Sequence, residues 1–377
     1  MISILRINNF RNYEHIKLII PDSPSNIIVV LYGNNGEGKT NLLESISLFS
    51  EFGGLRRAKY DEMINKKFEH WAITLDTQIC SFSITYSRIT GKKICKIDDN
   101  PRRNLEEFSK NYYVLWLTCE MDRLFLQAPS SRRDFIDMFC SVNSALHMKN
   151  VRNYEKLTKD RLKILKNYVN NSSEKEDIKK WLDVLENQIA ELGIKIADER
   201  MRTVEALGMN QIKNGFPEFR NEMTGAVEDS ILRPDNSMKI ECYEKELNDR
   251  REKDGFSGMT TFGPNRSDWR VFYVEKDMCA SMCSAGEQKM LLNGVFLSFV
   301  ASRLKEDSRH LILLLDDIVA YLDSAHRSLL FSNIRDFVGH HIGRLSVWLS
   351  GTSKELFSDL GDEVAFFRVH DGIVREG

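Results

Sequence analysis

The pattern of apolar and polar positions gives the first part of the chain the character of a sheet. Residues 2–8 and about 15–20 alternate as strands do, and residues 71–97 repeat that period of two. Between them, the apolar run Ile27–Leu31 predicts a further strand. The pattern therefore predicts an antiparallel sheet flanking a core strand.

The middle of the chain has the spacing of long amphipathic helices. Apolar residues recur at helical intervals over residues 154–168 and again over residues 181–196. The turn formers Asn170–Ser173 separate the two segments. The simplest arrangement is a short antiparallel helical hairpin over about 145–205.

This change in pattern predicts two lobes. The shift to helical spacing follows a strand expected at 112–116, and residues of about 215–260 are expected to return the chain to the core sheet. We therefore expect a discontinuous head of residues 1–118 and 258–377, and a mainly helical lobe of residues 119–257. The length of 377 residues and a hydrophobic content of 42% are sufficient for two cores.

Basic residues gather on the outer face of the first hairpin helix. Its cations are Lys149, Arg152, Lys156, Lys159, Arg161, Lys163 and Lys166, against only Glu155 and Asp160. A solvated face is the ordinary meaning of such a run, and contact with a phosphate backbone is the sharper hypothesis. The candidate DNA contacts are Lys156, Lys159 and Lys163, with Arg132 and Arg133 as further basic candidates.

The overall charge gives no support to polyanion binding. The chain has 53 basic and 55 acidic residues, a net charge of −2, so any such site must be local. Neither a signal peptide nor an apolar run long enough to span a bilayer is recognisable, which favours a cytoplasmic protein without a membrane partner. The seven cysteines contain no C-x-x-C pair and are expected to be reduced thiols.

A glycine-rich turn between the strand at 27–31 and a helix carries the strongest chemical signal. It matches G-x-x-x-x-G-K-[ST] and consists of Gly33, Asn34, Asn35, Gly36, Glu37, Gly38, Lys39 and Thr40. Such a turn directs backbone N–H groups and a helix dipole at nucleotide phosphates. Lys39 would reach the β- and γ-phosphates, Thr40 would bind Mg²⁺, and Arg11 could fold back onto the nucleotide.

A second block supplies carboxylates. The continuous apolar run Leu311–Leu315 ends in Asp316 and Asp317, as in a Walker B strand buried on both faces of a parallel sheet. Asp316 would hold Mg²⁺, and Asp317 would act as the general base that orients the attacking water. Glu120, in the lid segment expected after residues 112–116, is a further candidate metal ligand.

The order of the remaining motifs predicts an ABC-type ATPase. Ser284 and Gly286 begin a helix upstream of the Walker B strand, and a D-loop ending at Asp323 follows it. In that class two heads sandwich two nucleotides, so Ser284 and Gly286 would meet phosphate held by a second subunit. Ser350, Gly351 and Thr352, after the late strand Leu345–Leu349, occupy the switch position, with Thr352 as the candidate γ-phosphate sensor.

Several stretches resemble the RecF family over nearly the whole chain. They are Asn9–Tyr13, Gly33–Asn41, Pro129–Asp137, Gly263–Asp268 and Leu313–Asp317. The Pro129–Asp137 stretch is the most specific, because transporters and SMC heads do not share it. Asn265 stands where the family usually has histidine, and Glu287 stands where most ABC signatures have glutamine.

The resemblance implies an α/β fold, with an ABC-type P-loop head of mixed sheet and a second helical lobe. It implies a slow ATPase that uses ATP and Mg²⁺, dimerises with ATP, and binds single- and double-stranded DNA at gaps and junctions. The implied setting is recombinational repair, replication restart and the SOS response, where the protein assists RecA loading with RecR and often RecO.

Two other functions are open at this point. In the first, nucleotide binding fixes a structural or assembly dimer, SMC-like, that has no direct role on DNA. In the second, the ATPase serves a membrane or a nuclease, although no transmembrane domain and no Toprim-like segment is recognisable.

Overall fold

The computed structural model describes residues 1–21, 27–170, 175–212, 214–231, 240–320, 322–341, 343–361 and 364–377. These residues form two compact units. Unit 1 contains residues 1–122, 214–216 and 296–377, and unit 2 contains residues 123–213 and 217–295. The helix α9 (Ala285–Glu306) runs through the boundary between them.

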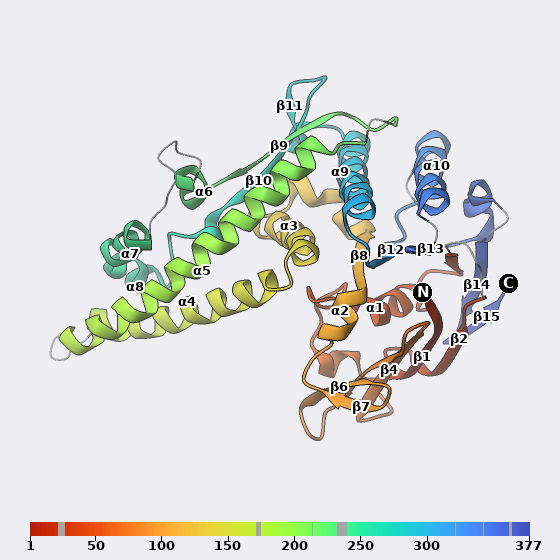
Figure 1. The fold of residues 1–377 in the computed structure, drawn as a ribbon, viewed down its shortest axis with the longest axis horizontal. Coiled ribbons are helices and arrows are strands. Elements are labelled where there is room, and N and C mark those ends of the chain that lie inside the picture. Colours follow the sequence, from red (N-terminus) through yellow and green to blue (C-terminus); the bar gives the residue numbers. More distant parts are fainter. Residues whose placement is uncertain are drawn as a thin grey trace. The chain divides into compact units, whose positions relative to one another are not determined.

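A six-stranded, largely parallel sheet forms the centre of unit 1. Its strand order is β15-β14-β3-β13-β12-β8, and all of these strands except β3 are labelled in Figure 1. The bounds are β3 (Ile27–Tyr32), β8 (Tyr112–Thr118), β12 (His310–Asp316), β13 (Leu345–Gly351), β14 (Val364–His370) and β15 (Ile373–Glu376). Only β15 is antiparallel to its neighbour. Strands β8, β12 and β13 are buried along their whole length, as expected of central parallel strands.

A second sheet of unit 1 is antiparallel, as the alternating pattern predicted. Its order is β2-β1-β4-β5-β6-β7. The strands are β1 (Ile2–Phe10), β2 (Tyr13–Ile19), β4 (His70–Thr77), β5 (Ser81–Ser87), β6 (Lys92–Ile97) and β7 (Asn100–Arg102). Trp71, Ile73 and Leu75 of β4 point into the core, and the residues between them are more exposed, so one face of this sheet is buried.

The helices of unit 1 precede or follow strands of the parallel sheet along the chain. They are α1 (Lys39–Ser47), α2 (Glu106–Asn111) and α10 (Ser324–His340), with the 3₁₀ segments Tyr60–Met63 and Lys354–Leu360. A further 3₁₀ segment, Cys119–Leu126, follows β8 and crosses into unit 2. No helix in the described part of the chain is both long and apolar enough to cross a membrane.

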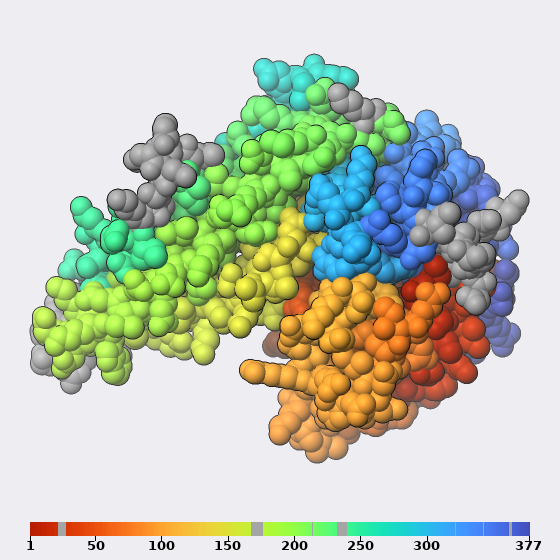
Figure 2. All heavy atoms as spheres, in the orientation of Figure 1, coloured from red at the N-terminus to blue at the C-terminus, as the bar shows by residue number. Residues whose placement is uncertain are grey.

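Unit 2 is built on a long helical hairpin. Helices α4 (His147–Asn170) and α5 (Lys175–Met209) lie side by side, and Figure 2 shows them in yellow-green and green. Of the predicted hinge Asn170–Ser173, Asn170 is the last residue of α4, and residues 171–173 lie outside the described residues. The other elements are α3 (Pro129–Asn143), α6 (Ala226–Ile231), α7 (Ile240–Asp249), α8 (Arg251–Ser257), β9 (Phe219–Thr224), β10 (Asp268–Tyr273) and β11 (Met278–Cys279).

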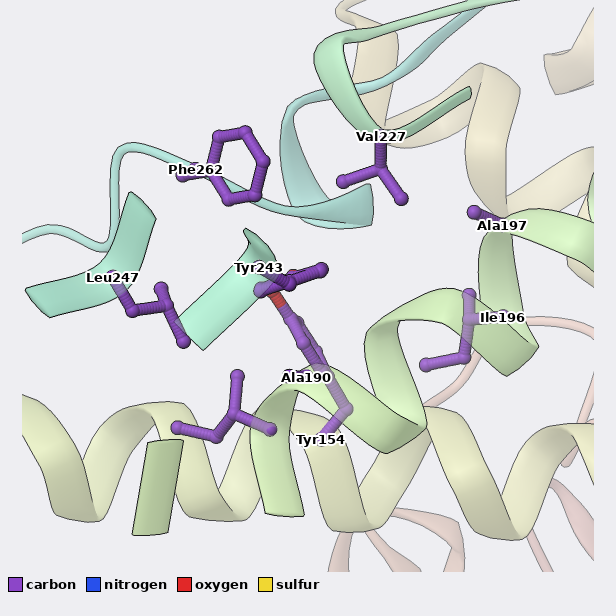
Figure 3. Close-up of a cluster of buried hydrophobic side chains, with 9 residues drawn as sticks. Tyr154, Ala190, Ile196, Ala197, Val227, Tyr243, Leu247 and Phe262 are labelled. Atoms are coloured by element: carbon purple, nitrogen blue, oxygen red, sulfur yellow. The ribbon is translucent and has the colours of Figure 1, made fainter. Parts of the chain in front are cut away.

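The core of unit 2 joins the hairpin to the helices that follow it. The buried cluster consists of Tyr154, Ile189, Ala190, Ile196, Ala197, Val227, Tyr243, Leu247 and Phe262 (Figure 3). The hydroxyl groups of Tyr154 and Tyr243 lie 3.2 Å apart, and Tyr154 also donates to Asn265 Oδ1 at 3.0 Å. This pairing satisfies two phenols that are otherwise enclosed by apolar side chains.

Two expectations about the lobes differ from the structure. Residues 258–295 belong to unit 2, whereas the sequence pattern assigned them to the head. The cause is the pairing of β9 with β10 in a separate three-stranded sheet, β11-β10-β9, so this region does not return to the core sheet of unit 1. The first boundary of the structure lies at Asp122, against the expected residue 118.

Arg161 is not part of the basic outer face of α4. Its side chain is fully buried, and it donates to Glu186 at 2.8 Å and to Asp254 at 2.6 Å. Arg251 binds the same Glu186. Helical spacing explains the difference, because Arg161 follows Tyr154 by seven residues, or two turns, and therefore lies on the same inward face.

A buried ion pair helps to connect two of the stretches that resemble the family, Pro129–Asp137 and Gly263–Asp268. Asp137, from Pro129–Asp137, accepts from Arg200 Nε at 2.7 Å and Nη2 at 2.8 Å, and also contacts His147 Nε2 at 2.8 Å. Arg200 Nη1 donates to the carbonyl of Pro264 at 2.7 Å. The Arg200 guanidinium thereby holds the pKa of Asp137 well below its usual range, even though burial alone would raise it.

His310 makes the stability of unit 1 depend on pH. The ring is buried between the carbonyl of Gly343 and the hydroxyl of Ser346, and burial lowers its pKa to about 4. The folded state therefore keeps the ring neutral, whereas the unfolded chain binds a proton below about pH 6.5, so stability falls as the pH drops from 6.5 to 4.

We expect acidification from pH 7 to pH 5 to destabilise the wild type through this residue by about 2 kcal/mol. The variant His310→Gln has no titrating ring and should lose correspondingly less. Urea unfolding at both pH values measures the difference. An identical pH dependence of wild type and variant would contradict the assignment.

Candidate nucleotide site

The glycine-rich turn lies between β3 and α1, the context that the sequence predicted. Gly38 precedes α1 with φ of 109°, and a Cβ atom there would lie 2.5 Å from the Asn12 side-chain amide. Gly33 has no room either, because a Cβ would overlap the carbonyl oxygen of Val369. Both positions therefore require glycine, and the turn is held closely by β1–β2 and by β14.

The side chain of Lys39 is folded into the glycine-rich turn, where the sequence predicted that it binds phosphate. Its ammonium donates to the carbonyl of Gly33 at 2.7 Å and to that of Asn34 at 2.8 Å, and the residue is 5% exposed. Burial lowers the pKa of Lys39, while the charges of Asp317 and Asp316 oppose that shift. A cation held this way can exchange loop carbonyls for phosphate oxygens without leaving the turn.

Strand order brings the Walker B carboxylates to the same edge. Strand β13 lies between β3 and β12, and the carboxyl ends of parallel strands meet at one edge of a sheet. Ser350, near the end of β13, donates to Asp316 Oδ1 at 2.7 Å and accepts from the N–H of Asp317 at 2.9 Å. Thr40 Oγ1 donates to the same Asp316 oxygen at 3.0 Å.

Two features of Asp317 are typical of a residue that binds a ligand. Its backbone is left-handed, with φ of 54°, which aspartate tolerates better than most residues but which is still uncommon. Its Oδ1 atom is buried and has no hydrogen-bond partner among the described residues. Such an atom is a place for a water or a cation to bind.

The oxygen ligands here fit Mg²⁺. Thr40, Asp316 and Asp317 offer a hydroxyl and carboxylates, the hard donors that this ion takes together with phosphate oxygens. Burial raises the pKa of Asp316 in spite of the hydrogen bonds from Ser350 and Thr40. A divalent cation would stabilise the ionised form and offset that shift.

Glu120 was predicted as a third ligand, and its segment lies beside these carboxylates. Thr118, the last residue of β8, pairs in register with Asp316. Burial, then the charges of Asp316 and Asp317, raise the pKa of Cys119. Glu120 itself is exposed and follows directly, so it stays a candidate rather than an observed contact.

Arg11 is held by the protein in this structure. It donates to both carboxylate oxygens of Glu44 in α1, at 2.9 and 2.7 Å, and to the carbonyl of Glu62 at 2.9 Å. Glu44 is completely buried. The contact with a nucleotide stays a prediction, because in this structure Nε and both terminal nitrogens of Arg11 bind protein groups.

The C-terminal hairpin fixes another residue of the turn. Glu37 accepts from the N–H of Asp371 at 2.6 Å and contacts His370 Nδ1 at 3.2 Å. The Asp371 amide, and after it the His370 ring, lower the pKa of Glu37 and keep this carboxylate ionised beside the turn. Thr352 is exposed and lines a 300 Å³ hollow with Gly33 and Asn34.

The signature residues are exposed in unit 2. Ser284 precedes α9 and forms a reciprocal cap with Glu287, the S-x-x-E capping box. Gly286 is exposed, with nothing within 4 Å of an added Cβ. Asp323 caps α10 in unit 1, because it accepts from the His326 N–H at 2.9 Å, so its predicted D-loop role must be compatible with that cap.

The contacts that Ser350 and Glu44 make at this site were not predicted from the sequence. Ser350 was placed in the switch segment without a role of its own, and Glu44 was noted only as part of the helix after the turn. The signal for Ser350 was its place at the carboxyl end of a late apolar strand, because Asp316 and Asp317 stand at the same end of the Walker B strand. Glu44 could have been noticed as an acidic residue on the otherwise apolar face of the helix after the turn.

Arg132 and Arg133 make their hydrogen bonds inside unit 2. Arg132 donates to both oxygens of Asp268, at 2.7 and 3.0 Å, and Arg133 donates to the carbonyl of Ser267 at 2.6 Å. Burial lowers the pKa of Arg133. These hydrogen bonds connect the two family-specific stretches and argue against a direct role of either arginine on DNA.

Comparison with known proteins gives full-length matches. Residues 5–253 match a family described as AAA domain. Proteins named DNA replication and repair protein RecF are similar to this chain. The one from Rhizobium rhizogenes is 33% identical, over 99% of this chain and 98% of its own length. The one from Brucella abortus is 35% identical, over 98% and 94%.

Solved structures share the fold. One is described as the recombination mediator protein RecF-ATPrS in the RecFOR pathway, with a TM-score of 0.81 and 22% identity over 100% of this chain and 98% of that one. An SMC head from Pyrococcus furiosus has a TM-score of 0.53 and 16% identity, over 100% and 95%. The predicted fold class, an ABC-type P-loop head with a helical lobe, is confirmed.

Removing the Lys39 ammonium should strongly weaken nucleotide binding. We expect Lys39→Ala to weaken the affinity for a nucleoside triphosphate by roughly 10- to 100-fold, as expected when a hydrogen bond between charged groups is removed. Fluorescence titration with a labelled nucleotide measures it, with Lys66→Ala, an exposed lysine, as the control. Wild-type affinity of Lys39→Ala would refute the site.

Proposed function

This chain belongs to the RecF family, and from that premise we propose that it is an ATP-dependent DNA-binding protein of recombinational repair and replication restart. It binds and slowly hydrolyses ATP with Mg²⁺, and ATP drives it to form a homodimer. The dimer holds gapped or junction DNA. The observation that carries the proposal is the arrangement of Lys39, Thr40, Asp316 and Asp317 at one sheet edge.

The chemistry follows from that arrangement. Lys39 and the turn would neutralise the β- and γ-phosphates, and the hydroxyl of Thr40 and the carboxylate of Asp316 would hold Mg²⁺, which would stabilise negative charge on the phosphates. Asp317 accepts a proton from the attacking water through its buried Oδ1 atom. Ser350 holds Asp316 and the backbone of Asp317 so that both carboxylates keep their positions.

Association through ATP is supported by the exposure of the signature. Ser284 and Gly286 lie at the start of a 22-residue helix, where the dipole favours an anion. In the proposed dimer they meet the γ-phosphate bound by the second subunit. Hydrolysis removes that phosphate and releases the dimer.

DNA binding is supported by the stripe of cations on α4. With Arg161 excluded, the stripe consists of Lys149, Arg152, Lys156, Lys159, Lys163 and Lys166, all exposed. The members follow one another by three or four residues, so they form one line about 25 Å long on a single helix face. Lys163 pairs with Asp160 at 2.9 Å, but it remains 77% exposed.

The same family argument extends to partners. We propose that the dimer acts with RecR, and with RecO where present, to assist RecA loading in the cytoplasm. The support is family membership alone. An SMC-like structural dimer without a DNA role is the alternative, and DNA binding by the ATP-driven dimer distinguishes the two.

Asp317→Asn should separate ATP binding from hydrolysis. Asparagine tolerates the same left-handed backbone but cannot take a proton, so turnover should fall by about 100-fold or more while the ATP-bound dimer persists. Phosphate release and sedimentation measure the two properties. Asp99→Asn, at another left-handed aspartate, is the control. Undiminished turnover would place the base elsewhere, with Glu120 as the next candidate.

Neutralising the stripe should weaken DNA binding without affecting ATP hydrolysis measured in the absence of DNA. We expect Lys156→Gln, Lys159→Gln and Lys163→Gln together to weaken binding to all sequences alike. The log–log salt dependence should flatten by nearly one unit for each duplex phosphate that the protein no longer neutralises.

The matched control replaces three exposed lysines of unit 1, Lys17, Lys66 and Lys92, with glutamine. It changes the net charge equally, so it removes any effect of net charge from the comparison. If the stripe variant binds DNA with the wild-type salt slope, α4 does not bind phosphate. If the wild type forms ATP-driven dimers that do not bind DNA at all, the structural-dimer alternative is correct.

A further inference from the structure

The signature serine is occupied by a neighbouring carboxylate. Glu287, in the first turn of α9, accepts from the N–H of Ser284 at 2.9 Å and from its hydroxyl at 2.9 Å, both through Oε2. The other oxygen, Oε1, is bound by the ammonium of Lys276. Lys276 lies on the turn between β10 and β11, above the ring of Tyr273.

The hydroxyl donor that an incoming phosphate needs is therefore engaged. A phosphate at the start of α9 would need the hydroxyl of Ser284 as a donor, and that proton is directed at Glu287. The carboxylate is ionised at neutral pH, because Lys276 and then Ser284 lower its pKa to about 2. A negative charge one helical turn from the phosphate site also repels the phosphate.

Lys276 counters both effects. Its ammonium neutralises Glu287, and it offers a partner for the carboxylate when that group leaves Ser284. The side chains of Lys276 and Glu287 are 48% and 27% exposed, so both can rearrange without unpacking the core. A glutamine in place of Glu287 would lack the charge and would release the serine more easily.

We propose that Lys276 and Glu287 form a latch that controls access to the signature serine. The Glu287 carboxylate stays hydrogen-bonded to Ser284 until a triphosphate approaches. Lys276 then binds the carboxylate away from Ser284, so that the serine hydroxyl can bind the triphosphate. The inference rests on the proposed ATP-driven dimer and names the residues that set the ATP concentration at which it forms. Lys276 is a positioning residue, since it acts through Glu287.

The latch predicts opposite effects for its two members. Glu287→Gln should lower the ATP concentration for half-maximal dimerisation by about 3- to 10-fold, because one charged hydrogen bond no longer opposes capture. Lys276→Met should raise it by a similar factor, because the carboxylate is then uncompensated. The double variant should dimerise at an ATP concentration close to that of Glu287→Gln. Lys276→Arg keeps the positive charge and should dimerise as the wild type does.

The experiment is sedimentation velocity of the full chain over a range of ATP concentrations, in the Asp317→Asn background so that ATP persists. Binding of labelled ATP to the monomer should be the same in every variant, which a general folding defect would not allow. Exposed residues of α5 provide the matched control, Glu191→Gln with Lys195→Met. This control should leave dimerisation unchanged.

Ser284→Arg separates failure of the latch from failure of the proposed function. If Ser284→Arg forms dimers as the wild type does, the signature does not meet phosphate and both ideas fall. If Ser284→Arg abolishes dimers but Glu287→Gln and Lys276→Met behave as the wild type, the latch alone is wrong. Shifts of the same sign in the two variants would also overturn it.

Discussion

The carboxyl edge of the parallel sheet depends on one hydroxyl group, that of Ser350. Two carboxylates side by side, Asp316 and Asp317, repel each other and lose hydration when buried. Ser350 donates to the first and accepts from the backbone of the second, while Thr40 approaches from the glycine-rich turn. The positive charge of Lys39 lies close enough to interact with both carboxylates, and a divalent cation at the same edge would offset their repulsion further.

A comparable constraint organises unit 2. The guanidinium of Arg200 donates hydrogen bonds to both the Asp137 carboxylate and the carbonyl of Pro264, and Arg132 forms an ion pair with Asp268. Breaking either ion pair would leave a charge buried or half-buried without its partner, which is expensive in a protein interior. The two family-specific stretches therefore work as structural connections within one unit, and the positions most typical of the family need not be those that bind DNA.

Much of the fold and the site was predictable because the signals are local. A glycine-rich turn after an apolar strand, two carboxylates after a buried strand and a period of two in the first sheet each need only neighbouring residues. The expectations that were wrong depended on contacts between residues far apart in the sequence. The pairing of β9 with β10 moved residues 258–295 into unit 2, and no local pattern contains that information. The expectation that Arg161 lies on the outer face of α4 was wrong and could have been avoided. Its seven-residue spacing from Tyr154 places both residues on the same, inward face.

In the proposed function, a nucleotide held at the edge of the parallel sheet drives two chains together on DNA. Sedimentation of the wild-type chain with a labelled gapped duplex, with and without ATP and Mg²⁺, tests it most directly. The account predicts monomers without nucleotide, and a species of two chains that carries the labelled DNA when ATP is present. ATP-saturated protein that sediments as a monomer and leaves the DNA unbound would contradict it.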